Sequence, residues 1–238
     1  MNAADTGGAA AGQYPDLFSL GRTAQAAARA ATDGRGFFAC WRRLLATGLS
    51  QGPASAASAF VEEADCAGQY AAAVAAGANT FIATSLPALI EATRHGLRGL
   101  LRLPLPAEEP VPQQERRLSQ LADQVRAGLV LDGVVPTPAQ DCLGLATLLF
   151  VARCRLGLAG VPHVLVDLDR LGPKLGQLAL GFGADELCGP IVVERALRLG
   201  DNVGSHAITR AEAAQLLRGA GLRACERVAG GGLEEFAP

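Results

Sequence analysis

PHVLVDLDRLGPKLGQLALGFGADELCGPIVVE, residues 162–194, predicts a strand, a helix and a second strand in close succession. The first apolar run, His163–Leu168, lies between a proline and an aspartate, as expected for a strand covered on both faces of a parallel sheet. Leucine and phenylalanine then recur every three or four residues, which predicts an amphipathic helix over Gly172–Leu180 that ends at a glycine. Asp185–Val193 follows as the second strand. Such a unit has a right-handed crossover, so its helix covers a face of the sheet.

The same alternation extends along the chain. Strands are predicted at Gly36–Trp41, Asn79–Thr84, Leu97–Leu103, Leu129–Val135, His163–Leu168 and Glu186–Val193. Helices are predicted at Asp16–Ala31, Ser55–Ala76, Leu86–His95, Gln113–Ala127, Cys142–Leu156, Gly172–Leu180 and Thr209–Gly219. Thr209 and Glu212 form a capping box at the start of the last helix. A full eight-stranded barrel takes about 250 residues, so we expect an α/β fold, an incomplete TIM-type barrel of about six parallel strands with flanking helices.

Composition favours one globular body. Half of the 238 residues are hydrophobic, which is enough for a single barrel-like domain over residues 14–238. Residues 1–13 are rich in alanine and glycine and are expected to form a disordered tail. No apolar run reaches the roughly 18 residues that a spanning helix needs, and no signal peptide is evident. We therefore expect a cytoplasmic protein whose six cysteines are free thiols.

Charge argues against a nucleic-acid partner. The net charge is −2, and the basic residues are dispersed among acidic ones. The most basic window, Arg94–Arg102, is interpreted as a solvated helix end, with a phosphate site as the alternative. The short acidic run of Glu62, Glu63 and Asp65 is interpreted in the same way, as a solvated helix face.

The helix-to-strand stretch also carries a family resemblance. Its pattern LGxKLxQLALxFGADxLxG, from Leu171 to Gly189, resembles the C-terminal part of the futalosine-pathway menaquinone enzymes. These are aminofutalosine synthase and dehypoxanthine futalosine cyclase, of the radical S-adenosylmethionine (radical SAM) superfamily. The resemblance covers residues 144–227, and a weaker likeness covers residues 16–38. It implies a barrel fold and a role in menaquinone biosynthesis.

The family's cluster motif is missing. Its members hold a 4Fe–4S cluster and S-adenosylmethionine through CxxxCxxC, because three thiolates leave one iron open for the cosubstrate. Here the cysteines are widely spaced, so no cofactor or metal is predicted by motif, and Cys40 and Cys66 are only weak candidate ligands. Other family positions also differ: Leu168 replaces a tryptophan, and Pro190 replaces a threonine.

Four polar residues remain as ligand-binding candidates: Gln177, Asp185, Glu186 and His163. The resemblance implies that Asp185 and Glu186 contact polar groups of a ligand. As a structural alternative, the two carboxylates cap and anchor a helix-to-strand turn, because they begin a strand whereas barrel sites gather at strand ends. No nucleophile or metal-binding motif is evident, and the sequence leaves the catalytic residues unknown.

The residues and the resemblance together favour a degenerate radical-SAM-like protein. Its predicted role is a non-catalytic one in the menaquinone pathway, binding a nucleoside-like molecule or a true radical SAM enzyme. The alternative is an active enzyme of the same family, using either acid–base chemistry on a futalosine-like nucleoside or a cluster held unusually by Cys40 and Cys66. Exposed edge strands must be covered, which also suggests a homo-oligomer.

Overall fold

The computed structural model describes residues 17–39, 41–43, 58–66, 68–139, 144–189, 191–192, 207–228 and 232–237. The predicted tail, residues 1–13, lies outside them. The helices are α1 (Leu17–Thr32), α2 (Glu63–Cys66), α3 (Tyr70–Ala75), α4 (Leu86–Arg94), α5 (Val111–Arg126), α6 (Leu145–Gly157), α7 (Leu168–Gly181) and α8 (Arg210–Gly219). The strands are β1 (Arg35–Phe38), β2 (Trp41–Arg43), β3 (Ser58–Glu62), β4 (Ala78–Ala83), β5 (Arg98–Leu105), β6 (Gly133–Pro138), β7 (His163–Asp167), β8 (Glu186–Cys188), β9 (Ile191–Val192), β10 (Ile208–Thr209), β11 (Arg223–Arg227) and β12 (Leu233–Glu235).

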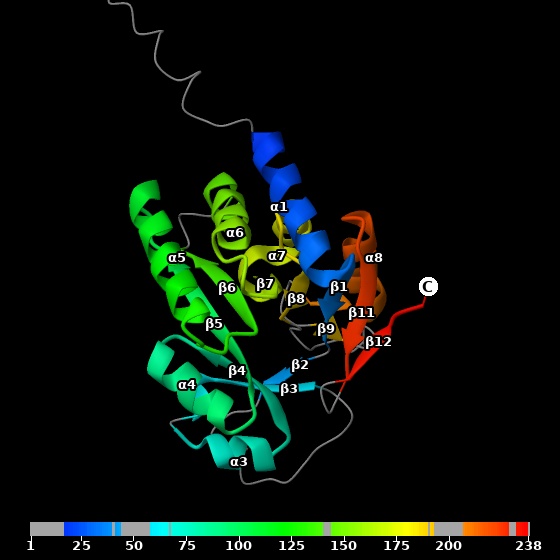
Figure 1. Ribbon diagram of the computed structural model, residues 1–238. Helices are drawn as coiled ribbons and strands as arrows, with labels where there is room; N and C mark the ends of the chain where they lie inside the picture. Colours follow the sequence, from blue (N-terminus) through cyan, green and yellow to red (C-terminus); the bar gives the residue numbers. More distant parts are fainter. Residues whose placement is uncertain are drawn as a thin grey trace, which may run out of the picture.

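The main sheet curls into a partial barrel (Figure 1). Its strand order is β12-β11-β1-β8-β7-β6-β5-β4-β3-β2, and every pairing is parallel except that of β11 with β12. In a flat sheet, the seven steps from β1 to β2 would cover about 34 Å. Only two residues separate Phe38 from Trp41, which limits the distance between their Cα atoms to about 11 Å. The sheet therefore has to bend round until β2 returns to β1.

Side chains alternate between the inside of the curled sheet and its helix-covered outside. On β5, Leu101 and Leu103 belong to the large core under the helices, whereas Leu100 belongs to a separate small core. That small core also contains Ile82, Val135, Leu165 and Cys188, one residue from each of four other strands. Because strand side chains alternate, Arg98 and Arg102 share the inward face of β5 with Leu100.

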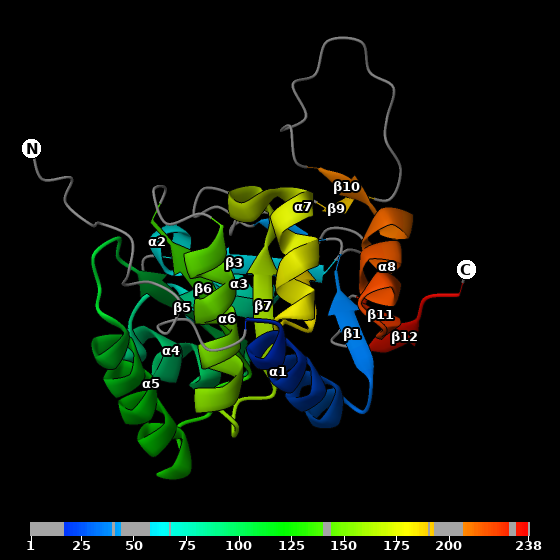
Figure 2. The same cartoon turned by 90° about the horizontal axis from the view of Figure 1, so that it is seen from above.

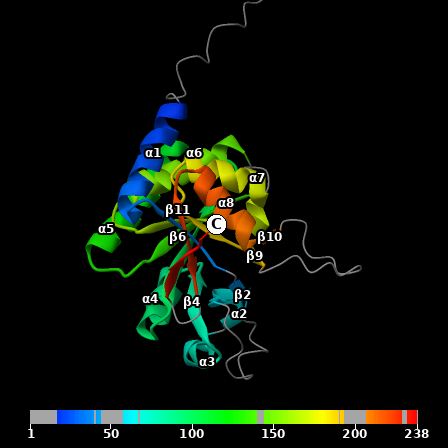
Figure 3. The same cartoon turned by 90° about the vertical axis from the view of Figure 1, so that its right-hand side faces the viewer.

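The helices pack on the outside, as the parallel topology requires. Helix α1 packs against α6 and α7 (Figure 2), and α8 packs against β11 (Figure 3). The predicted capping box at Thr209 and Glu212 is confirmed, with both reciprocal hydrogen bonds present. Helix α7 starts at Leu168, four residues before the predicted start at Gly172. The backbone of Gly172 itself is non-helical (φ 69°, ψ 163°), and the helix kinks there, just before Pro173. No helix in the described part of the chain is long and apolar enough to cross a membrane.

The predicted α/β fold, an incomplete barrel with flanking helices, is confirmed, although the curled sheet has more strands than the six predicted. The prediction of one helix over Ser55–Ala76 is wrong. This segment forms β3 and the short helices α2 and α3. Its alanines favour a helix locally, but β3 fills the place between β2 and β4, and pairing on both sides overrides helix propensity. The strand predicted up to Val193 is also interrupted, at Gly189, where φ is 121°.

Candidate functional site

Two clusters of charged side chains lie inside the curled sheet, one on either side of the small apolar core. The base cluster consists of Arg98, His163, Asp185, Glu186 and Arg227, at the beginnings of β5, β7 and β8 and the end of β11. The mouth cluster consists of Glu62, Arg102 and Asp167, and its two carboxylates are at the carboxyl ends of β3 and β7. The carboxylates of the two clusters differ in accessibility, whereas the basic side chains of both clusters are exposed to a similar degree, 14–16%.

Glu186 is the centre of the base cluster. Its side chain is completely buried, and Arg98 binds it in a bidentate manner, with Nη1 and Nη2 donating to the two carboxylate oxygens at 2.8 and 2.7 Å. Arg227 donates to the same two oxygens from Nε and Nη2, both at 3.0 Å. Burial alone would raise the pKa of Glu186, but Arg98 and Arg227 outweigh it and hold that pKa far below its usual range.

Asp185 is enclosed just as completely. Its Oδ1 accepts hydrogen bonds from Arg155 and from the backbone N–H of Val164, at 2.8 Å for the latter, and its Oδ2 lies 2.6 Å from Nδ1 of His163. Arg155 comes from α6 and also donates to the carbonyl oxygens of Pro162 and Gly183. Asp185 thus joins α6 to the turn between α7 and β8.

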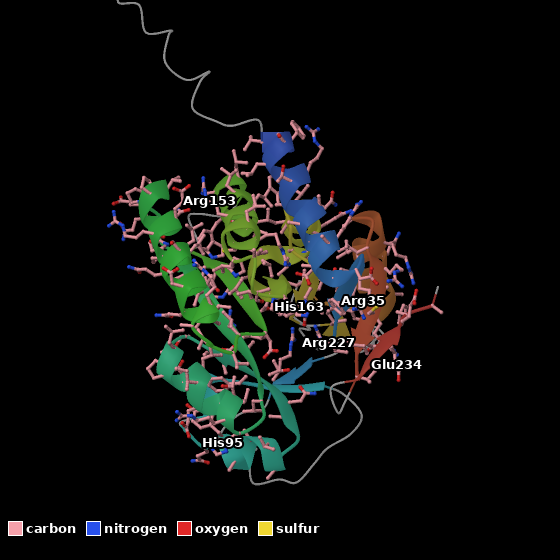
Figure 4. The ribbon with its side chains drawn as sticks, viewed as in Figure 1. Arg35, His95, Arg153, His163, Arg227 and Glu234 are labelled. Atoms are coloured by element: carbon pink, nitrogen blue, oxygen red, sulfur yellow. The ribbon has the colours of Figure 1, made fainter. Side chains whose placement is uncertain are left out.

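His163 connects the two buried carboxylates to β11. Its Nε2 lies 3.0 Å from Nη2 of Arg227 (Figure 4 labels both residues). Because a guanidinium only donates, Nε2 accepts this hydrogen bond, and Nδ1 carries the proton that is shared with Asp185. Phe37 packs edge-on against the imidazole, with ring centroids 4.9 Å apart, and lies under the Arg227 guanidinium. Both nitrogens of the imidazole and all four oxygens of the two carboxylates thus have partners in the protein.

The carboxylates of the mouth cluster are more open. Arg102 donates to Glu62 from Nη2 at 2.5 Å and to Asp167 from Nη1 at 3.0 Å. The Glu62 side chain is 20% exposed and that of Asp167 is 10% exposed, whereas the side chains of Asp185 and Glu186 are not exposed at all. Burial would lower the pKa of Arg102, but the charges of Glu62 and Asp167 outweigh it and raise that pKa.

Glu63 holds the neighbouring loop at the end of β4. Its carboxylate accepts hydrogen bonds from the backbone N–H groups of Thr84 and Ser85, at 2.7 and 3.0 Å, and from both hydroxyl groups. Partial burial would raise the pKa of Glu63, but these hydrogen bonds outweigh it and lower that pKa. The contact positions the start of α4 beside the mouth cluster.

The sequence-predicted ligand residues separate into two places. His163, Asp185 and Glu186 are brought together in the base cluster, as a group that ties secondary-structure elements together. Gln177 does not join them, because it lies exposed on α7, near Gly219 of α8. Of the weak metal candidates, Cys66 is the last residue of α2, and Cys40 lies outside the described residues.

The mouth cluster was missed because Arg102 and Glu62 were assigned to solvated helix surfaces and Asp167, although it lies in a predicted strand, was not singled out. Arg98 and Arg102 lie on β5 with inward side chains, so the prediction of a solvated helix end over Arg94–Arg102 is wrong for both. Glu62 ends β3 and pairs with Arg102, so it does not belong to a solvated helix face. A signal was available: arginines at alternate inward positions of the apolar run RGLLRLPL require buried partners.

The described residues do not fit the cluster that the family resemblance implies. The cysteines Cys154, Cys188 and Cys225 are free and buried, and lie on α6, β8 and β11. Burial raises the pKa of Cys154 to about 12 and also raises those of Cys188 and Cys225, which disfavours the thiolate that binds iron. Within the described ranges, no group of three or more His, Cys, Asp or Glu side chains is placed to hold a metal ion.

No family model matches the chain, and no curated protein matches it in sequence. Among solved structures, it is similar to the crystal structure of methylornithine synthase (PylB). The sequence identity is 12%, the match covers 87% of this chain and 88% of the other, and the TM-score is 0.49.

Proposed function

We propose that the protein binds a small polar molecule at the mouth cluster without cluster chemistry. The observation that carries this proposal is that the partly accessible carboxylates of Glu62 and Asp167 end β3 and β7, where barrel proteins form their sites, and that Arg102 of β5 pairs with both. The two carboxylates of the base cluster, those of Asp185 and Glu186, are completely buried and cannot contact a ligand.

The chemistry of the mouth cluster suits a nucleoside-like ligand. Carboxylate oxygens of Glu62 and Asp167 accept hydrogen bonds from hydroxyl or amino groups, and the Arg102 guanidinium donates to ring nitrogens, carbonyls or phosphate. The small apolar core lies beneath and gives a non-polar floor. Because the ligand must compete with ion pairs that already exist, we expect moderate affinity and a strong dependence on Arg102.

The resemblance of residues 144–227 to the futalosine-pathway enzymes supports a menaquinone-pathway nucleoside as the natural ligand. This region supplies β7, α7, β8, α8 and β11, including Asp167. The missing CxxxCxxC motif and the scattered buried cysteines support a binding role over radical catalysis. Association with a true radical SAM enzyme, or with a second copy, stays a prediction.

Calorimetric titration with futalosine, inosine and adenosine tests the proposal. We expect at least one nucleoside to bind, and Arg102→Met to weaken that binding at least tenfold, because charge-assisted hydrogen bonds are lost. Arg223→Met, which removes a half-exposed arginine on β11, is the matched control and should bind normally. Failure of all three ligands, or normal binding by Arg102→Met, would remove the mouth cluster as the site.

Anaerobic reconstitution with iron and sulfide tests the absence of cluster chemistry separately. We expect no stoichiometric iron and no cluster absorbance band. A reducible cluster at one per chain would instead support the active radical enzyme, with Cys40 and Cys66 as the first positions to substitute.

A further inference from the structure

An apolar hollow lies on the outside of the barrel, away from both charged clusters. It has a volume of about 430 Å³ and lies between α4 and α5, two helices that run along one side of the molecule (Figure 1). Its apolar walls are formed by Leu86 and Ile90 of α4 and by Leu129 and Val130 after α5. A second hollow of about 220 Å³ lies beside it and shares Leu86 and Gln124 with the first.

Small residues at the end of α5 keep the hollow open. Ala127 caps the helix, and Gly128 follows it with a φ of 105°, a conformation that disfavours any side chain. A β-carbon built on Gly128 would meet no atom within 4 Å. Ile90 is 39% exposed and Val130 is 62% exposed, so apolar surface of the hollow faces water. The hydrophobic effect therefore favours the binding of a ligand whose apolar part covers this exposed surface.

One charged side chain lines the hollow among the described residues, and it is a cation. Arg94 is 71% exposed and donates to Glu91 one helical turn before it, at 3.0 Å. Exposed ion pairs at this spacing contribute little to stability. The carboxylate of a ligand can therefore replace Glu91 as the partner of the Arg94 guanidinium at a small cost in free energy. We propose that this hollow binds a small molecule with an apolar body and a single carboxylate group. This site is separate from the mouth cluster and does not depend on the function proposed there.

Isoleucine methyl NMR with decanoate as the probe tests this proposal. The chain has four isoleucines, Ile82, Ile90, Ile191 and Ile208, and only Ile90 lines the hollow. We expect decanoate to shift the Ile90 δ1-methyl signal in a saturable way and to leave Ile191 and Ile208 unchanged. Decyltrimethylammonium, with the same chain length and the opposite charge, should bind at least tenfold more weakly.

Two pairs of variants separate specific binding from a general effect. Ala127→Phe fills the hollow and should abolish the Ile90 shift, whereas Ala26→Phe adds the same ring to an exposed position on α1 and should not. Arg94→Ala should weaken decanoate binding about tenfold. Arg126→Ala removes an equally exposed arginine that pairs with Asp123 at the same spacing, and it should bind as the parent does. If the Ala127→Phe variant does not fold, Val130→Ser takes its place, and it should weaken the binding of decanoate because it removes an apolar wall of the hollow.

Three results would overturn the proposal. The first is an unchanged Ile90 signal at saturating decanoate. The second is equal binding of the ammonium probe, which would mean that Arg94 selects no acid. The third is a shift of the Ile90 signal with protein concentration alone, which would mean that two copies of the chain contact each other at the hollow.

Discussion

The base cluster and the mouth cluster use the same chemical groups under different conditions. In the base cluster, two carboxylates with no exposed surface are each held by arginine, and a histidine joins them. In the mouth cluster, Arg102 pairs with two carboxylates that still reach solvent, and the exposed Arg170 lies 3.9 Å from one of them, Asp167. Removing a partner from an enclosed pair leaves a charge that water cannot reach, whereas removing one at the mouth leaves a charge that water can solvate. We therefore expect the first cluster to serve stability, and we propose the second as the place where a ligand binds.

Neutralising Glu186 is expected to have the largest effect. Glu186→Gln leaves Arg98 and Arg227 without their shared counter-charge and should lower the free energy of unfolding by about 3–5 kcal/mol. Urea unfolding followed by circular dichroism measures this. Glu235→Gln, on the exposed strand β12, is the control and should change stability by less than about 0.5 kcal/mol. A loss below about 1 kcal/mol for Glu186→Gln would show that water solvates Arg98 and Arg227 well enough to replace the carboxylate.

The pH dependence of stability gives an effect of intermediate size. The pKa of Glu186 is lower in the folded state than in the unfolded chain, so its stabilisation is complete above the unfolded value of about 4.3 and fades as the pH falls below it. The slope rises from half to nearly the full value of about 1.4 kcal/mol for each pH unit, so the parent should lose about 1.4 kcal/mol between pH 4.3 and pH 3 from this group alone. Urea titrations at several pH values should show a shallower acid limb for Glu186→Gln. Parallel acid limbs in the two proteins would assign the loss to other carboxylates.

Replacing the central arginine of the mouth cluster should have the smallest effect on stability. Arg102→Met keeps an unbranched side chain and leaves Glu62 and Asp167 partly in contact with water, so we expect a loss of only about 1 kcal/mol. The comparison with Glu186→Gln in the same urea experiment sharpens the contrast between the clusters. Equal losses for the two variants would mean that the mouth cluster is also enclosed, and the binding proposal would lose its main support.

Much of the fold was predictable because its signals are local. The apolar run at His163, the leucine spacing of α7 and the capping box at Thr209 each depend on residues a few positions apart, and all three elements are present. The segment Ser55–Ala76 was mispredicted because its alanines favour a helix, while the pairing of β3 with β2 and β4 depends on distant residues.

By itself, the sequence determined the succession of strands and helices, the partial barrel and the position of Asp185 and Glu186 at the start of a strand. Only the tertiary structure decided which charges meet. Glu186 pairs with Arg98, 88 residues away, and Arg102 pairs with Asp167, 65 residues away. Helix and strand periodicity report which face of an element is apolar, whereas the curl of the sheet decides which inward residues lie opposite each other. For that reason the enclosed base and the open mouth became distinguishable only when the strands were placed in space.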